Sequence, residues 1–279
     1  MARYVEQLAT PNHTEEVKLV VLSFSRSATL GVYNACNLLG YRSYHTLEAF
    51  KNGVHDMKIL NEALESGLYE NKGMPFTKTE FDKWFANYNV LENFPTDVIT
   101  EMPCYMAPQF LAAYPDAQYL LVERNPDDLV KSWKATTFRF ADALDRFPMS
   151  LLKHFDPMLS EIDRFCKAIL PAVTYGKGTT PEGELALRDY YVNYLTKVKC
   201  LVPPNKLHVV RLEDGLDWEH LCPLLGEEIP ILPWPIKHSP AEFKVVMGAP
   251  LAPGARRAMI RVTSLALALV GTVAWWTWW

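Results

Sequence analysis

An arginine and a serine in the middle of the chain have a spacing that suits the binding of an anion. They are the first and the last residue of the segment Arg124-Asn125-Pro126-Asp127-Asp128-Leu129-Val130-Lys131-Ser132, which follows an apolar run from Gln118 to Val122. The run is typical of a buried strand, and Asn-Pro often starts a helix. Arg124 would then stand at the C-terminal end of a strand, and Ser132 would lie about two turns into the next helix. A guanidinium, a hydroxyl and free N–H groups at a helix start would bind an anion. An ordinary helix start with a solvated arginine would show the same residues.

A second candidate anion site lies closer to the N-terminus. The run from Lys18 to Phe24 (KLVVLSF) predicts a central strand, and the loop from Ser25 to Gly31 follows it. Apolar residues at positions 32, 35, 36 and 39 then have helical spacing, and Gly40 suits a helix end. Strand, small-residue loop and helix form a phosphate cradle in many proteins. The loop lacks the G-x-x-x-x-G-K-[ST] pattern, however, and an ordinary turn between strand and helix is the alternative.

Together, the two segments resemble the sulfotransferase superfamily, and in particular the branch common in fungi. The first loop of that family typically reads [KR]-[ST]-G-T-[TS], and its second motif reads R-x-P-x-D-x-x-x-S. The second motif is matched in full by Arg124, Pro126, Asp128 and Ser132. The first motif is matched in part by Arg26, Ser27 and Thr29. Other stretches similar to the fungal branch are Leu39 to His45, Ala113 to Ala117, Leu201 to Leu207 and Glu213 to Trp218. The resemblance covers most of the chain before its C-terminal segment.

The resemblance implies a P-loop-like fold, the co-substrate 3′-phosphoadenosine 5′-phosphosulfate (PAPS) and no metal ion. By analogy, Arg124 and Ser132 would hold the 3′-phosphate. Arg26 would also neutralise charge on the transferred group, and the 5′-phosphosulfate would lie in the cradle formed by Ser25, Arg26, Ser27, Ala28 and Thr29. Near the end of the domain, the segment from Ile231 to His238 resembles the family's F-P-R-x-N segment. Lys237 replaces its arginine there, which keeps the charge but loses the fork.

The chain departs from the family pattern in the donor loop. Ala28 stands where the loop usually has glycine, and alanine resists the left-handed backbone that glycine allows. Leu30 and Gly31 replace hydroxyl residues that would donate hydrogen bonds to the phosphosulfate. The sequence therefore predicts a weakened donor site.

The position of the catalytic base also departs from the pattern. In the family, a histidine or an acid at a strand end, shortly before a proline, often deprotonates the acceptor. The comparable segment from Val90 to Pro95 (VLENFP) has Asn93 where the branch usually has aspartate. Two candidate bases remain: Glu92, which on a strand would face away from Asn93, and His45, whose usual pKa lies near neutrality. A surface carboxylate and a packed loop histidine are the alternatives.

The composition is that of a globular protein with a large core. The chain has 279 residues, 49% hydrophobic and 22% charged, and its net charge of −4 gives no general attraction to nucleic acid. Its 5 cysteines are scattered without ligand spacing, which predicts reduced thiols in the cytosol and no structural zinc. The charged N-terminal residues contain no secretory signal.

Apolar runs separated by helical patterns predict an α/β fold with a mainly parallel sheet flanked by helices. The candidate strands are Lys18 to Ser23, Val90 to Leu91, Gln118 to Val122 and Leu207 to Arg211. Ligands of such sheets bind beyond the C-terminal strand ends, where the first loop, Glu92 and Arg124 would all lie. Residues from about 138 to 200 include a stripe of Phe, Met and Leu at helical spacing. The stripe predicts core packing or a helical lid over an apolar acceptor.

The C-terminal segment has the properties of a membrane anchor. Residues 262–279 carry no charge, and as a transmembrane helix they would span roughly 27 Å. Arg256, Arg257 and Arg261 precede this segment, as expected on the cytoplasmic side, and tryptophans gather at its far end. Prolines and glycines before it predict a flexible linker over residues 247–261, after a catalytic domain of residues 1–246. A helix packed on the domain or in an oligomer interface is the alternative.

These observations lead to one main hypothesis and two alternatives. The main hypothesis is transfer of a sulfonyl group from PAPS to a hydroxyl of a small lipophilic acceptor, catalysed at a membrane, with a role in secondary metabolism. The altered donor loop and Asn93 favour instead a PAPS-independent lyase, dehydratase or cyclase on the same scaffold. A membrane-tethered binding protein without catalysis is the third reading. The sequence leaves the acceptor and the oligomeric state open.

Overall fold

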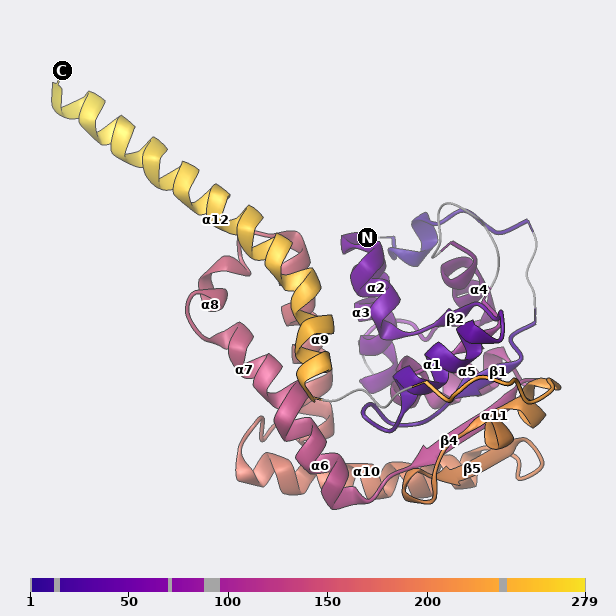
Figure 1. Cartoon of the computed structure of the whole chain (residues 1–279). Coiled ribbons are helices and arrows are strands. Elements are labelled where there is room, and N and C mark those ends of the chain that lie inside the picture. The colour runs from indigo at the N-terminus through magenta and orange to yellow at the C-terminus, as the bar shows by residue number, and fades with distance from the viewer. Residues whose placement is uncertain (1, 13–15, 70–71, 88–95, 236–239, 279) are drawn as a thin grey trace.

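The computed structural model describes residues 2–12, 16–69, 72–87, 96–235 and 240–278 (Figure 1). Its strands form one five-stranded sheet in the order β2-β3-β1-β4-β5, and all neighbouring strands are parallel. The predicted α/β fold is thereby confirmed. The strands are β1 (Leu19–Val21), β2 (Ser43–Tyr44), β3 (Val98–Ile99), β4 (Gln118–Glu123) and β5 (Leu207–Arg211).

Helices connect the strands and cover both faces of the sheet (Figure 1). The α-helices are α1 (Thr29–Leu38), α2 (Thr46–Asn52), α3 (Val54–Leu68), α4 (Lys78–Asn87), α5 (Ala107–Ala113), α6 (Pro126–Trp133), α7 (Arg139–Asp145), α8 (Met149–Leu152), α9 (Pro157–Val173), α10 (Pro181–Leu201), α11 (Trp218–Leu225) and α12 (Pro240–Trp278). Shorter segments are the 3₁₀ helices η1 (Val5–Gln7), η2 (Met102–Tyr105) and η4 (Leu212–Asp214), and the π-helical η3 (Lys134–Phe138).

The order of the strands creates a crevice at the C-terminal end of β1. After β1 the chain forms β2 and β3 on one side of it, and then β4 and β5 on the other side. A ligand crevice forms where neighbouring connections leave a sheet in opposite directions. The residues that directly follow β2, β3, β1 and β4 therefore meet around one space.

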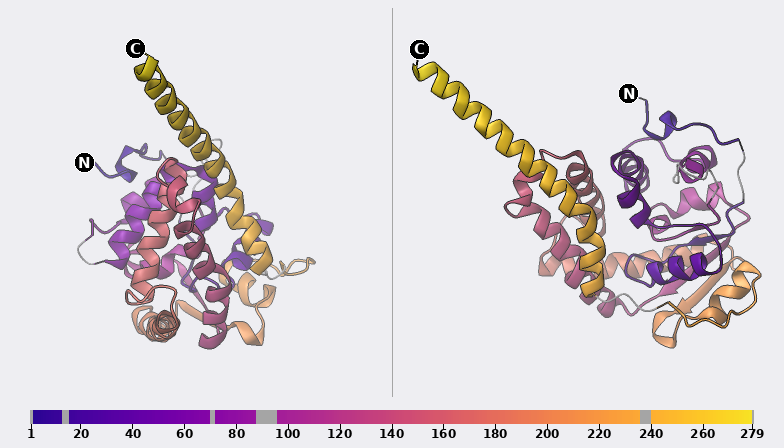
Figure 2. Two further views of the ribbon diagram at one scale, coloured as in Figure 1. Left: turned by 90° about the vertical axis from the view of Figure 1, so that its left-hand side faces the viewer. Right: turned by 45° about the horizontal axis from the view of Figure 1, so that its top comes forward.

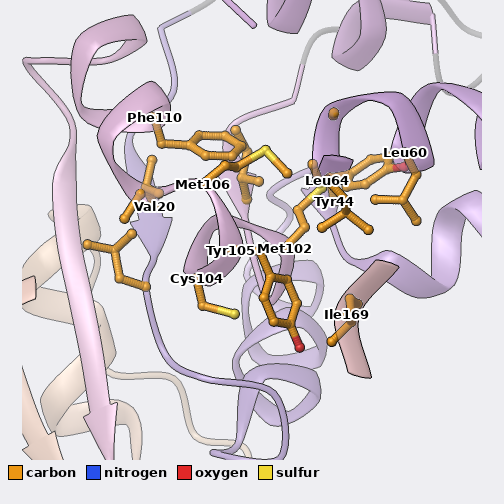
Figure 3. Packing of buried hydrophobic residues seen from close by; sticks show 14 of the residues in the cluster. Val20, Tyr44, Leu60, Leu64, Met102, Cys104, Tyr105, Met106, Phe110 and Ile169 are labelled. Carbon is orange, nitrogen blue, oxygen red and sulfur yellow. The ribbon is translucent and has the colours of Figure 1, made fainter. Parts of the chain in front are cut away.

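Both faces of the central strands are buried, which explains why these strands read as continuous apolar runs. Along β1, Val20 packs into the larger hydrophobic cluster, whereas Leu19 and Val21 pack into a second one. Strand β4 alternates in the same way. The larger cluster includes residues of α3, α5 and α10, and Figure 3 shows its central part around Met102 and Phe110. The second cluster includes residues of α1 and α11. The sheet is thus held rigidly between two helical layers.

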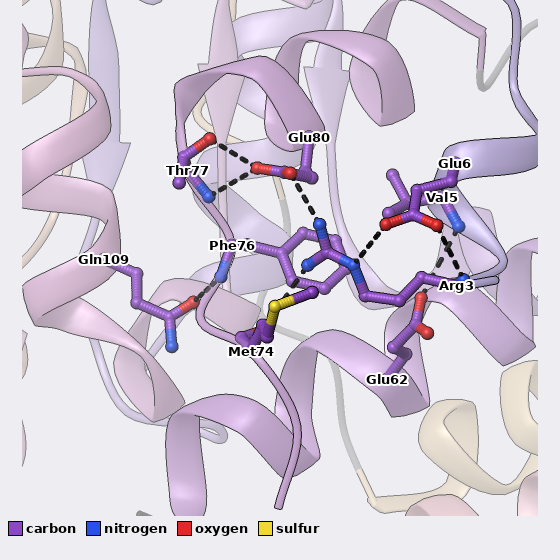
Figure 4. A network of polar contacts seen from close by, with 9 residues as sticks. All are labelled: Arg3, Val5, Glu6, Glu62, Met74, Phe76, Thr77, Glu80 and Gln109. Atoms are coloured by element: carbon purple, nitrogen blue, oxygen red, sulfur yellow. Dashed lines mark hydrogen bonds and ion pairs between the residues drawn. The ribbon is translucent and has the colours of Figure 1, made fainter. Parts of the chain in front are cut away.

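The N-terminal segment is fixed to the helices that follow β2 (Figure 4). The Arg3 guanidinium binds the carboxylate of Glu6 at 3.1 Å and that of Glu80 on α4 at 2.6 Å. It also lies 5.4 Å from the centre of the Phe76 ring. The N–H group of Phe76 donates in turn to the side chain of Gln109 on α5, at 3.0 Å. This network connects four chain segments on the side of the sheet that carries β2 and β3.

The helical stripe of the sequence forms α7, α8 and α9, together with η3. On α9, Met158, Ile162 and Ile169 are buried in the larger cluster, and Phe165 and Leu170 are partly buried at its edge. The stripe therefore contributes to the core along its length, and it also exposes a row of apolar side chains to the pocket described below.

The C-terminal segment differs from the expected flexible joint. Residues 247–261 belong to α12, one continuous helix that runs along α9 and then leaves the domain (Figures 1 and 2). Its part from Leu251 to Trp278, 28 residues, is long and apolar enough to cross a membrane. The flexible joint was predicted from prolines and glycines, which have a low helix propensity, but the tertiary contacts of α12 outweigh that low propensity. Gly254 and Ala258 allow the helix to approach α9 closely, as described below.

Candidate active site

The loop after β1 holds two residues in the left-handed backbone region. Arg26 has φ 73° and Ala28 has φ 62°, with Ser27 between them. Helix α1 begins at Thr29, and its N-cap is Ala28, which has no side chain to cap the first turn. Turns of this kind direct successive backbone N–H groups toward one side, where they bind an anion. Ala28 thus adopts the conformation for which the related loops have glycine, in spite of its side chain.

Two arginines meet at this loop. The Arg124 guanidinium donates from Nη1 to the backbone carbonyl of Arg26 at 2.7 Å, and Arg26 donates from Nε to Ser132 Oγ at 3.3 Å. Burial lowers the pKa of the Arg26 guanidinium, while Glu101 raises it and Arg124 lowers it again. Because an arginine stays protonated in proteins, the loop keeps two poorly solvated positive charges side by side. A bound dianion would be stabilised by both.

The first of two pockets at this loop lies between α1 and the end of the domain. This pocket, called the basic pocket for its two arginines, Arg26 and Arg124, is also lined by Asp128, Glu213 and the start of α1. Its far wall is formed by Trp234 and Pro235. The Trp234 ring packs edge-on against Trp218, at 4.9 Å between ring centres, and Trp218 Nε1 donates to the Leu232 carbonyl at 2.7 Å. A flat aromatic wall facing basic groups suits a nucleotide.

On the other side of Arg26, Glu101 points its carboxylate at the loop. Oε1 accepts a hydrogen bond from Ser25 Oγ at 2.9 Å, and Oε2 lies 3.2 Å from His45 Nε2. Glu101 is separated from β3 by Thr100 and has φ 67° and ψ −62°, with Met102 N–H donating to the Thr100 carbonyl at 2.9 Å. This is the rare γ-turn with positive φ at its centre, which is strained for any residue other than glycine. Such strain is typical of functional sites.

His45 supports this carboxylate. It follows β2 as the N-cap of α2, and its Nδ1 accepts a hydrogen bond from Leu47 N–H at 3.1 Å. This assignment places the proton on Nε2, which therefore donates toward Glu101, with Thr29 Oγ1 a further 3.4 Å neighbour. The histidine thus has no lone pair directed at the pocket, and it fixes the orientation of the acid.

The second pocket lies beyond Glu101 and is mostly apolar. It is enclosed by α2, η2, the η3–α7 region and α9, with Leu30, Leu47, Phe50, Trp133, Phe140 and Ile169 among its lining residues. The rings of Phe50 and Phe165 meet at 5.7 Å and close one side. Arg26, Thr29 and Leu30 line both pockets. The loop after β1 therefore separates a basic pocket from an apolar one.

Other titratable groups in the apolar pocket are held in their neutral form. Burial raises the pKa of Tyr105 far above its usual range, and it raises the pKa of Cys166 to about 12. Neither a phenol nor a thiol of this kind accepts a proton or attacks near neutral pH. Among the described residues that line this pocket, Glu101 is the carboxylic acid.

The comparison with known families decides the relationship. The sequence profile described as "Sulfotransferase domain" matches residues 18–243. The chain belongs to the sulfotransferase family. A curated relative of this chain is "Ava biosynthesis cluster protein M" of Aspergillus versicolor, which is 26% identical over 222 residues, covering 77% of this chain and 78% of that protein. A crystal structure of a sulfotransferase from Alicyclobacillus acidocaldarius aligns over 92% of this chain and 97% of its own, with 14% identity and a TM-score of 0.43.

The structure brings most of the expected site residues of this sulfotransferase-family protein together. Ser25, Arg26, Ser27, Ala28, Thr29, His45, Arg124 and Ser132 all lie in or beside the loop after β1 and the neighbouring strand ends. Ser27 is fully buried and is not among the lining residues of either pocket. Glu92, Asn93 and Lys237 lie outside the described residues, and their roles stay predictions.

Glu101 is the residue that sequence reasoning missed. The expected pattern was an acid at a strand end shortly before a proline, and the sequence offers it twice. We assigned it to Glu92 and Pro95, but Glu101 and Pro103 also match, after the apolar pair Val98–Ile99. Strand β3 is formed by that pair, so the second match is the one that the sheet places at the site.

Proposed function

We propose that this sulfotransferase transfers a sulfonyl group from PAPS to a hydroxyl of a small lipophilic acceptor. One observation carries the proposal: Arg26 lines both the basic pocket and the apolar pocket, and Glu101 lines the apolar pocket beside the same loop, where it accepts a hydrogen bond from Ser25. An anionic donor and an apolar acceptor would meet there, next to a cation that stabilises the transferred group and an acid that accepts a proton.

In this proposal the basic pocket holds the nucleotide. The N–H groups at the start of α1 and the Arg26 guanidinium would bind the 5′-phosphosulfate. Arg124 and Ser132 would bind the 3′-phosphate; Ser132 Oγ, now 3.3 Å from Arg26 Nε, would link the two charges. The aromatic wall at Trp234 would face the adenosine. Sulfonyl transfer would then depend mainly on positioning and on charge stabilisation, as phosphoryl transfer does.

Glu101 is the general base of the proposed reaction. The acceptor oxygen would attack sulfur while its proton passes to the Glu101 carboxylate, and the bond from sulfur to the phosphate oxygen would break to release 3′-phosphoadenosine 5′-phosphate (PAP). Ser25 and His45 hold the carboxylate by hydrogen bonds to its two oxygens, so its orientation is fixed before the acceptor arrives. A positioned base of this kind typically contributes about 10²–10⁴ in rate. His45 would act through Glu101, as a positioning residue.

The acceptor class follows from the apolar pocket and from α12. A pocket walled by Phe50, Phe140 and Phe165 selects an apolar molecule, and a membrane span beside it would place the enzyme where such molecules dissolve. The fungal relative bears the name of a biosynthesis cluster, which supports a role in secondary metabolism. We therefore place the protein on a membrane by a C-terminal span, with the catalytic domain in the cytosol.

Titration of PAP into the full-length chain in detergent tests the donor site. Tight binding that is lost in Arg124→Ala supports the proposal, since a charge-assisted hydrogen bond to phosphate is worth about 1.5–3 kcal/mol, or roughly 10- to 150-fold in affinity. Arg188→Ala is a matched control, because Arg188 pairs with Asp127 on the same helix start but does not line the basic pocket. Absence of PAP binding at millimolar concentration would refute the proposed donor.

The altered donor loop favours a second candidate, a PAPS-independent lyase, dehydratase or cyclase. Leu30 and Gly31 supply no hydroxyl to a phosphosulfate, whereas Glu101 and the apolar pocket would serve proton transfer alone. Incubation of the enzyme with membrane extract and sulfur-labelled PAPS separates the candidates. A labelled product supports sulfonyl transfer, and a new unlabelled product that forms equally well without PAPS supports the second candidate. If neither forms, the non-catalytic binding role would gain support.

A further inference from the structure

The inner half of α12 is joined to the lid by an ion pair between the half-exposed Arg257 and the buried Asp156. Arg257 donates to both carboxylate oxygens of Asp156, from Nε at 2.7 Å and from Nη2 at 3.1 Å. The Asp156 side chain is 0% exposed, and it is also the N-cap of α9, where it accepts from the N–H groups of Met158 and Leu159. Arg261 adds a hydrogen bond to the Phe155 carbonyl at 2.6 Å. A bidentate pair that also caps a helix fixes distance and rotation together.

Small residues on α12 make this contact close. A Cβ atom added to Gly254 would meet Leu159 at 2.9 Å and Asp156 Oδ1 at 3.0 Å, and Ala258 is 0% exposed against Leu152 and Leu159. Real Cβ atoms essentially never come this near to another atom, so larger side chains would push the helix away. These close contacts therefore allow α12 to pack on α8 and α9 in one position, which fixes the direction of α12 relative to the lid.

The helix leaves the domain where its charge-free stretch begins. Val262 still packs beside the small cluster around Leu152, whereas the described residues from Thr263 onward are exposed. Arg261 is the last charged residue before this point. If α12 enters a bilayer, the membrane surface lies near Val262, since charged side chains stay outside the hydrocarbon region.

The turn between α7 and α8 lies at the same level. Phe147 is 81% exposed and Leu151 is 42% exposed, although the neighbouring Met149 and Leu152 pack beneath α12. Figures 1 and 2 show α7 and α8 beside the middle of α12, where that helix leaves the domain. Exposure of two bulky apolar side chains to water is unfavourable. Because they lie next to a candidate membrane span, the bilayer would be their apolar partner.

The charges around these side chains suit a membrane surface. Exposed basic residues surround the turn and the exit of α12, namely Arg146, Arg256 and Arg261, with His154 nearby. The exposed acid of the turn, Asp145, is bound to the buried Lys153 at 2.6 Å. Basic residues at this depth are attracted to anionic lipid headgroups.

We infer that the α7–α8 turn is a second membrane contact, in which Phe147 and Leu151 enter the bilayer that α12 crosses. The inference rests on the proposed membrane insertion of α12. Two contacts on one rigid unit hold the domain in a single orientation, with α7–α9 toward the lipid. Phe140 of α7 and Phe165 of α9 line the apolar pocket, so the pocket lies behind the wall that faces the membrane. An acceptor dissolved in the bilayer would then reach it without crossing bulk water.

Depth measurements on the full-length chain test this inference. The exposed Cys200 is replaced by serine, and a polarity-sensitive fluorophore is attached after Phe147→Cys, Leu151→Cys, Val273→Cys or Leu185→Cys, each in a separate variant. Leu185 is the matched control, an exposed apolar residue on α10, 65% exposed and outside the turn. The variants are reconstituted in phosphatidylcholine vesicles with and without phosphatidylserine, and quenching by spin-labelled lipids is measured.

We expect labels at 147 and 151 to shift to the blue and to be quenched by lipids labelled near the headgroup. The label at 273 should be quenched by lipids labelled in the chain, and the label at 185 by neither. Phosphatidylserine should increase quenching at 147 and 151 alone. If 273 is quenched while 147 and 151 behave like 185, α12 is inserted and the second contact is refuted. If 273 is not quenched either, membrane anchoring itself fails, and the inference fails with it.

Discussion

Replacing Ala28 by glycine is expected to stabilise this protein. Ala28 has φ 62° and ψ 14°, and a left-handed backbone costs a residue with a Cβ atom about 1–2 kcal/mol. Glycine removes this cost but loses about 0.5–1 kcal/mol because its unfolded chain is freer. The difference leaves a gain of about 0.5–1 kcal/mol, which raises the Tm by about 1–4 °C in a chain of this size.

The same substitution should improve, or at least preserve, the binding of PAP. Ala28 lines the basic pocket beside Arg26 and the start of α1, so loss of its methyl group allows a phosphate closer to the backbone N–H groups. Thermal unfolding in detergent and calorimetric titration of PAP measure the two effects separately. Neither measurement needs the acceptor to be known.

A second alanine in the same helix provides the control. Ala35 is fully buried in the interior of α1, where glycine costs about 1 kcal/mol of helix propensity in addition to lost packing. Ala35→Gly should therefore lower the Tm, while Ala28→Gly raises it. If Ala28→Gly lowers the Tm as Ala35→Gly does, the left-handed conformation of the loop, and with it the proposed phosphate cradle, is wrong.

Three further outcomes follow from the same contacts. Glu101→Gln should reduce the rate of sulfonyl transfer by about 10²–10⁴ and leave PAP affinity unchanged, as measured by initial rates and by titration; equal loss of both would contradict its role as the base. Burial raises the pKa of Asp156, but hydrogen bonds from Arg257 and from the start of α9 outweigh this and bring the pKa below its usual 3.8. The stability gained from the charged form of Asp156 is therefore complete above that usual value, and it is lost as the pH falls through the folded pKa. Asp156→Asn should lower the Tm at neutral pH and have little effect in acid. A difference in Tm that stays constant across pH would refute this. Removal of residues 262–279 should release the protein from vesicles in a flotation assay yet keep PAP binding, because the described residues beyond Val262 contact neither pocket.

The sheet illustrates how far the sequence carries the prediction. Strand β4 was predicted with one residue missing, because an apolar run buried on both faces is unambiguous. Strand β5 was predicted with its observed bounds, although Val210 is its one buried residue. Strands β2 and β3 are only two residues long, Ser43–Tyr44 and Val98–Ile99. Pairs this short have no period of their own, and they form strands because β3 hydrogen-bonds to the central β1 and β2 hydrogen-bonds to β3.

The difference between the predicted base, Glu92, and the proposed base, Glu101, follows from the strands that the sequence did not reveal. His45 directly follows β2, and Glu101 follows β3 after one intervening residue. Without β3, nothing in the sequence ranked Glu101 above Glu92, since each acid precedes a proline. His45 was found for its chemistry, but its function as a cap of α2, which occupies its Nδ1, depends on a helix start that the sequence did not reveal. The arginine motif, in contrast, contains its own strand and helix, so Arg124 and Ser132 were placed correctly.

The distribution of backbone strain argues that this site is in use. In the described part of the chain, four residues other than glycine have positive φ: Arg26, Ala28, Glu101 and Tyr175. The first three line the two pockets, and each costs the fold about 1–3 kcal/mol. A protein is only marginally stable, so strain without function is readily lost through substitutions that relieve it. In a vestigial site, a relaxed backbone would be expected at Arg26 and Glu101, whose side chains form the site. Here the strained residues instead aim a guanidinium and a carboxylate at a common border, the arrangement that a group transfer between an anionic donor and an apolar acceptor requires.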